Sequence, residues 1–139
     1  MPEPERAPFA YATIRVVPRV EREEFVNVGV VLFSRPRKYL GVRTNLDPNR
    51  LRMFWPEIDL EAVARQLEVI RFVGAGDPRG GAIASLPPAE RFGWLAAPAS
   101  TSVQPGPVHA GLAHDPEAAL DDLFTELVET PAPGVGSGS

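Results

Sequence analysis

The chain has 139 residues, the size of one ordinary domain, and 44% of them are hydrophobic and 23% charged. It contains no cysteine, which excludes disulfides, thiolate catalysis, iron–sulfur clusters and cysteine-ligated zinc. The formal net charge of -4 at pH 7 argues against a protein that binds nucleic acid through overall basic charge.

The first third of the chain predicts three strands joined by short links. Residues 11–20 are rich in β-branched side chains, with Pro18 near the strand end because proline donates no ladder hydrogen bond. Residues 25–33 are nearly continuously apolar, which is typical of a strand covered on both faces. A turn and a third strand over 39–43 follow. This succession predicts an antiparallel meander.

Helices are predicted next. Asp47 followed by Pro48 is typical of a helix start and predicts one short turn of helix. Asp59 is placed to cap a longer helix that runs to about residue 73, because apolar residues recur there at helical spacing. The glycine-rich residues 74–81 are expected to form a flexible break.

The last third of the chain predicts both element types. Residues 87–95 predict a short helix, and residues 101–104 and 108–112 predict two strands around a turn at 105–107. Asp115 is placed to cap a last helix with an apolar stripe.

Strands, then helices, then more strands predict an α+β fold, in which two main helices pack on an antiparallel β-meander sheet. We expect a single domain over residues 10–129, a flexible N-terminal segment over 1–9 and a disordered tail over 130–139. The chain starts with polar residues and prolines, which predicts no secretory signal, and no apolar run approaches the about 20 residues that span a bilayer. We therefore expect a cytoplasmic protein that makes no membrane contact.

An amide and a glycine interrupt the most apolar predicted strand. A buried Asn27 must be hydrogen-bonded or it costs about 1–3 kcal/mol, and Gly29 weakens a strand unless another backbone or a ligand comes close. With a period of two, these residues share one face of the strand. Arg15 lies on the neighbouring strand, and Glu24 stands near it. Such a cluster suits either an anion or substrate site, or a structural network that pins the strand register.

Other motifs point to no defined chemistry. His109 and His114 lie five residues apart, which is not a helical metal-ligand spacing, and we expect no metal and no cofactor. The glycine-rich residues 74–81 lack the Lys-Ser/Thr of a phosphate-binding loop. Residues 100–102 lack the glycine elbow around a nucleophilic serine. Whether the protein is an enzyme stays open at this point.

A local excess of positive charge lies in the first half of the chain. Between residues 35 and 52 there are six basic side chains against one acid, Asp47, with aromatic residues nearby. This pattern fits a surface that docks an acidic protein, a weak site for single-stranded nucleic acid, or a solvated turn. The candidate interaction surface consists of Arg35, Arg37, Lys38, Arg43, Arg50 and Arg52.

Four segments of the chain resemble a bacterial family known as domain of unknown function 3037 (DUF3037). Residues 11–19 (YATIRVVPR) and 24–32 (EFVNVGVVL) are similar to its opening signature, residues 91–111 (RFGWLAAPASTSVQPGPVHAG) to its second, and residues 115–128 to its closing helix. The positions that match its motifs are Arg15, Pro18, Glu24, Asn27, Gly29, Arg91, Ser100, Thr101, Gln104, His109, Gly111 and Asp115.

The resemblance implies a partner rather than a reaction, because it brings no established activity with it. It implies that the protein is a partner or regulator of a kinase-like neighbour that resembles the toxin kinase HipA. The first hypothesis is therefore an accessory interaction protein. A weak nucleic-acid module is the least favoured alternative. The other alternative is a small-ligand binder or enzyme that uses the candidate polar cluster, Arg15, Glu24, Asn27, Arg91, Gln104 and His109.

Overall fold

β-Branched and apolar runs form the strands of the structure, and aspartates stand at the start of its longer helices. The computed structural model describes residues 5–18, 24–99 and 101–129. In chain order the elements are β1 (Ala7–Val16), β2 (Val26–Ser34), β3 (Tyr39–Thr44), α1 (Pro48–Phe54), α2 (Leu60–Ala75), two 3₁₀ turns (Pro78–Gly80 and Ala82–Ser85), α3 (Pro88–Leu95), β4 (Val103–Pro105), β5 (His109–Ala113), α4 (Pro116–Phe124) and a π-helical turn (Thr125–Glu129).

All pairings in the sheet are antiparallel, in the order β3-β2-β1, and β4 and β5 share the other edge of β1. The meander formed by the first three strands is confirmed. Both β4 and β5 run antiparallel to β1, so the chain does not reverse at residues 105–107 and the turn expected there is wrong. Between β4 and β5, the three residues 106–108 instead stand opposite only two residues of β1, Ala12 and Thr13. The register of β5 against β1 is therefore shifted by one residue relative to that of β4.

A β-bulge separates Asn27 from Gly29. Ile14 pairs with Gly29, but the next residue, Arg15, pairs with Asn27. The two β2 residues therefore lie on opposite faces of the sheet, and the expectation that they share a face is wrong because the bulge breaks the period of two. Gly29 itself permits a close backbone approach, since a Cβ there would lie 2.7 Å from the carbonyl oxygen of Arg43.

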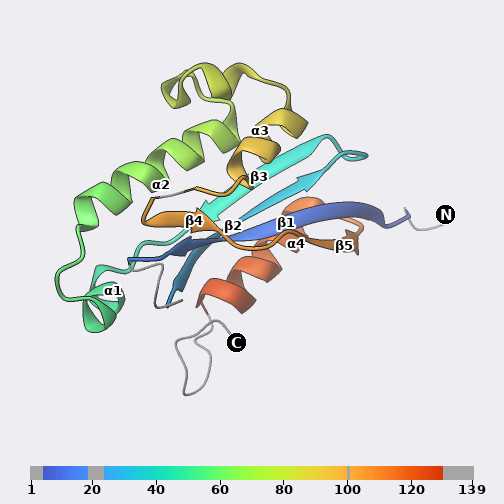
Figure 1. Cartoon of the computed structure of the whole chain (residues 1–139). Helices are drawn as coiled ribbons and strands as arrows, with labels where there is room; N and C mark the ends of the chain where they lie inside the picture. The colour runs from blue at the N-terminus through green and yellow to red at the C-terminus, as the bar shows by residue number, and fades with distance from the viewer. Residues whose placement is uncertain (1–4, 19–23, 100, 130–139) are drawn as a thin grey trace.

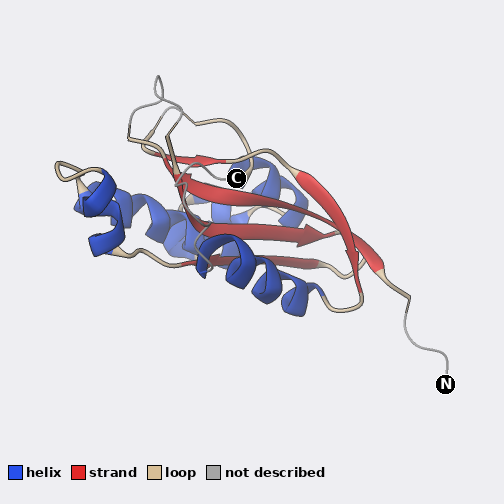
Figure 2. Ribbon diagram, turned by 90° about the horizontal axis from the view of Figure 1, so that it is seen from below, coloured by secondary structure: helices blue, strands red, loops and turns tan. Residues whose placement is uncertain are grey.

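Helices cover both faces of the sheet, as Figures 1 and 2 show. α2 and α3 lie on one face, and α4 lies on the other. β2 is buried on both faces, which agrees with its apolar run. The core on the α2 face includes Ile14, Val16, Val28, Val63 and Leu67. The core on the α4 face is formed by Val30, Leu32, Leu120, Phe124 and Val128. The α+β fold with two main helices on the sheet is confirmed.

The expected aspartate caps are confirmed. Asp47, Asp59 and Asp115 each accept a hydrogen bond from a backbone N–H in the first turn of α1, α2 and α4, respectively. The flexible break expected over 74–81 is wrong in its first and central parts. α2 continues to Ala75, and residues 78–80 form a 3₁₀ turn that Asp77 caps.

The sheet begins earlier than the sequence pattern indicates. β1 starts at Ala7 because its first residues pair with β5, so residues 7–9 of the expected flexible segment belong to the sheet. Residues 1–4 and the expected tail over 130–139 lie outside the described residues. Within the described part of the chain, no helix is long and apolar enough to cross a bilayer.

Candidate functional site

Three members of the candidate polar cluster lie in one row across the sheet. The register places Arg15 of β1 opposite Asn27 of β2 on one side and opposite Gln104 of β4 on the other. The side chains of directly opposed residues on antiparallel strands point to the same face of the sheet, and their Cβ atoms lie about 5 Å apart. The amide of Gln104 is engaged locally, because its Nε2 donates to the carbonyl oxygen of Thr101 at 2.9 Å.

Arg15 is held by its neighbours on three sides. Its Nε donates to Oγ1 of Thr13 at 3.1 Å, and its Cζ lies 3.8 Å from the centre of the Phe25 ring. A Cβ at Gly106 would approach the Arg15 guanidinium to 2.8 Å, so glycine there leaves the space that the guanidinium needs. Burial of the guanidinium lowers the pKa of Arg15 from its usual value, because desolvation disfavours the charged form.

Only one of the two polar atoms of the Asn27 side-chain amide is hydrogen-bonded within the described residues. Its Nδ2 donates to the carbonyl oxygen of Leu127 at 3.2 Å, which ties β2 to the end of α4, whereas its buried Oδ1 has no hydrogen-bond partner within the described residues. Among the described residues, the amide is therefore hydrogen-bonded through its nitrogen only. Asn27 lines a cavity of about 270 Å³ together with polar residues that include Asn45, Asp47 and Arg50.

The other members of the polar cluster lie elsewhere. Arg91 is on α3, across the sheet, and donates to the carbonyl oxygens of Val73, Gly74 and Leu86 at 2.9–3.0 Å. His109 is exposed on β5 opposite Tyr11, which is four residues, about 13 Å, along β1 from Arg15. Glu24 is exposed just before β2. The structure therefore brings Arg15, Asn27 and Gln104 together, and it separates Arg91 and His109 from them.

The six basic residues divide into groups. Arg35, Arg37 and Lys38 lie in the turn between β2 and β3, and α1, which carries Arg50 and Arg52, lies at the opposite end of β3 (Figure 1). Arg43 lies between the two groups on β3. Its Nη1 forms a 2.8 Å ion pair with Asp121 of α4, and its Cζ lies 4.4 Å from the Phe124 ring centre.

α1 exposes large apolar side chains that the charge pattern did not single out. Leu51 anchors this helix in the core with 1% of its surface exposed, while Met53 is 82% exposed and Phe54 is 46% exposed. Arg52 beside them is exposed and has no hydrogen bond or ion pair with the described residues. The sequence feature that could have indicated this surface is the Arg-Met-Phe run at the end of the short helix that Pro48 starts. A helix this short buries only Leu51, so the apolar side chains that follow remain exposed.

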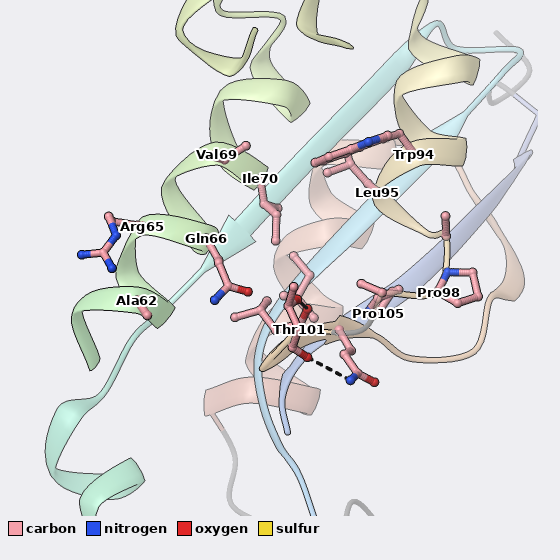
Figure 3. A pocket seen from close by; sticks show the side chains of 15 residues that line it. Ala62, Arg65, Gln66, Val69, Ile70, Trp94, Leu95, Pro98, Thr101 and Pro105 are labelled. Atoms are coloured by element: carbon pink, nitrogen blue, oxygen red, sulfur yellow. Dashed lines mark hydrogen bonds between the residues drawn. The ribbon is translucent and has the colours of Figure 1, made fainter. Parts of the chain in front are cut away.

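A cavity of about 510 Å³, here called the α2–α3 cavity, lies between these helices and the segment that leads into β4. In Figure 3, Ile70 of α2 extends toward α3, which carries Trp94 and Leu95, and Gln66 of α2 extends toward the segment that carries Thr101. No motif in the sequence indicated this cavity. The walls come from distant segments, and the lining residues on one side, which lie between Trp94 and Pro105, fall within the second stretch of family resemblance.

No cluster of three or more His, Asp or Glu side chains in residues 5–18, 24–99 and 101–129 is arranged to hold a metal ion. Ser100, one of the positions in the family resemblance, lies outside the described residues.

Comparison with known proteins identifies the family. A model of the family described as protein of unknown function (DUF3037) matches residues 11–128. No curated protein matches the chain, and no solved structure matches it. The match begins within β1 and ends within the π-helical turn, so it includes at least part of every strand and helix described above. The chain therefore belongs to the DUF3037 family.

Proposed function

We propose that this protein is an accessory binding protein that docks an acidic protein partner through α1. The observation that carries the proposal is the exposure of Met53 (82%) and Phe54 (46%) on one short helix, beside Arg52, which has no hydrogen bond or ion pair with the described part of the chain. Met, Arg and aromatic residues are enriched at the centres of protein interfaces, where a few such side chains supply most of the binding energy.

The anchoring of α1 supports this role. Leu51 holds the helix against the core, and the Asp47 cap fixes its first turn, so Met53 and Phe54 are presented on a fixed backbone. A preorganised surface loses less conformational entropy on binding. α1 carries two arginines and no acid, in a chain of net charge -4, so the partner surface that complements it is acidic with an apolar pocket.

The chemistry of α1 indicates the kind of partner surface but does not identify the partner. The family resemblance implies a HipA-like kinase, and we propose this kinase as the first partner to test. The positive charge of α1 requires only an acidic docking surface on that kinase. The cytoplasmic location and the bacterial source expected from the sequence belong to the same proposal.

The experiment is a titration of the wild-type protein with a purified HipA-like kinase encoded beside it, at low and physiological salt. We expect Met53→Ala and Phe54→Ala to weaken binding mainly by raising the dissociation rate. Arg52→Glu should slow association and reduce its salt dependence. The matched control is Arg35→Glu, which reverses an exposed charge at the β2–β3 turn and should leave binding unchanged.

Two results would reject the proposal in different ways. Absence of binding to the kinase at low salt would reject the partner. Binding that is weakened by Arg35→Glu and unaffected by the α1 variants would reject the surface. A single-stranded oligonucleotide in the same assay tests the nucleic-acid alternative. We expect it to bind weakly with a steep dependence on salt, and sub-micromolar affinity at physiological salt would favour that alternative instead.

A further inference from the structure

The α2–α3 cavity is independent of α1 and has the properties of a small-molecule site. Its volume of about 510 Å³ falls in the range of about 300–1,000 Å³ that is typical of such sites. Its floor consists of the buried side chains Ile14, Leu95 and Val103, which belong to the core. Its rim includes Val69 and Trp94, which remain 41% and 43% exposed. The cavity therefore leaves an aromatic ring and an apolar floor partly open to solvent.

The charges around the cavity indicate an uncharged ligand. Among the described residues that line it, Arg65 is the only charged one. Figure 3 shows that the Arg65 side chain extends from the outer side of α2, away from the cavity, whereas the neighbouring Gln66 extends toward it. A charged ligand group placed on the apolar floor would lose its hydration without gaining a partner, which is unfavourable.

Gln66 supplies the polar contact. It has no hydrogen bond with the described residues, and its amide offers both a donor and an acceptor. The polar side chains on the facing wall are already engaged, because Thr101 Oγ1 donates to the Val103 carbonyl oxygen and Gln104 Nε2 donates to the Thr101 carbonyl oxygen. The ligand edge that meets Gln66 therefore carries a hydrogen-bond donor or acceptor.

We propose that the α2–α3 cavity binds an uncharged, planar aromatic molecule, with its ring against Trp94 and a polar edge at Gln66. Aromatic rings pack favourably against a tryptophan in offset or tilted arrangements, which adds to the gain from burying apolar surface. This function goes beyond partner docking and does not depend on it, because the cavity and the exposed side chains of α1 share no residue.

The test uses two dyes of the same ring system. N-phenyl-1-naphthylamine is uncharged and carries one N–H donor, and 8-anilinonaphthalene-1-sulfonate is its anionic relative. With the full chain, we expect the uncharged dye to bind saturably at one site and to quench Trp94, and the anionic dye to bind at least about tenfold more weakly. Amide chemical shifts should change at α2, α3 and β4. Absence of saturable binding, or equal affinity for both dyes, overturns the proposal.

Variants assign the binding to this cavity. Trp94→Ala should weaken binding of the uncharged dye by about tenfold, and Gln66→Leu should weaken it by about fivefold through loss of one hydrogen bond. Both side chains are partly exposed, and circular dichroism checks that each variant folds. The matched control is Leu112→Ala, since Leu112 is 56% exposed on β5 outside the cavity. Dye binding that Leu112→Ala weakens as much as Trp94→Ala does would show nonspecific adsorption and overturn the proposal.

Discussion

Arg91 offers the sharpest test of how α3 is attached to α2. Its Nη1 donates to the carbonyl oxygens of Val73 and Gly74 at 3.0 and 2.9 Å, and its Nε donates to that of Leu86 at 2.9 Å. The first two acceptors lie in the last turn of α2, which has no basic side chain of its own. Arg91 therefore supplies, from the neighbouring helix α3, the positive charge that stabilises the C-terminal end of α2.

The expected effect of Arg91→Leu follows from these contacts. Each hydrogen bond from a charged donor to a part-buried carbonyl contributes about 1.5 kcal/mol, and the charge near the end of α2 adds about 0.5 kcal/mol. The exposed bond to Leu86 adds little. Leucine and arginine have similar helix propensities, so α3 itself is unaffected. We expect a loss of about 3.5 kcal/mol in the free energy of unfolding and a fall of about 10 °C in Tm.

Urea denaturation followed by circular dichroism measures this loss. Arg91→Lys keeps the charge but not the planar fork, so its loss should be intermediate. The matched control is Arg71→Leu on the exposed side of α2, because Arg71 has no hydrogen bond with the described residues. It should change stability by less than about 0.5 kcal/mol. A loss below about 1 kcal/mol for Arg91→Leu would refute the structural role and return Arg91 to the list of candidate ligand-binding residues.

Three further predictions concern local packing and charge. Gly74→Ala should lower stability by about 1–2 kcal/mol, as measured in urea, because its Cβ would clash with the Cγ2 methyl of Val42 on β3; an unchanged midpoint would contradict this close packing. Gly93→Ala should instead raise stability by about 0.5–1 kcal/mol, since a Cβ at this helical position meets no atom within 4 Å. The hydrogen bonds from Arg79 lower the pKa of Asp77 from 3.8 to about 2. Because the folded pKa lies below the unfolded one, this pair stabilises the protein above about pH 4, and the stabilisation is lost as the pH falls toward 2. Carboxyl resonances should titrate with a midpoint near 2 for Asp77 and return toward 3.8 in Arg79→Gln; identical midpoints in the two proteins would rule out the pairing.

The sequence by itself determined the elements whose causes are local. The apolar run of β2 predicted a strand buried on both faces, and the aspartates at 47, 59 and 115 predicted the starts of three helices. These features depend on side-chain alternation and on hydrogen bonds between residues two to four positions apart. The meander of β1, β2 and β3 followed because short links join neighbouring antiparallel strands.

Only the tertiary structure decided which side chains meet. Asn27, Arg15 and Gln104 share a row because β1 pairs with strands from both halves of the chain, and the bulge before Gly29 then sends Asn27 to the face of α4. Arg91 belongs to the same family signature as Gln104. However, α3 lies on the face of the sheet that α2 covers, where the Arg91 guanidinium donates hydrogen bonds to carbonyl oxygens at the end of α2. The α2–α3 cavity has walls from residues that lie about 30 positions apart in the chain, and their distance is set by packing of the helices on the sheet rather than by any local pattern.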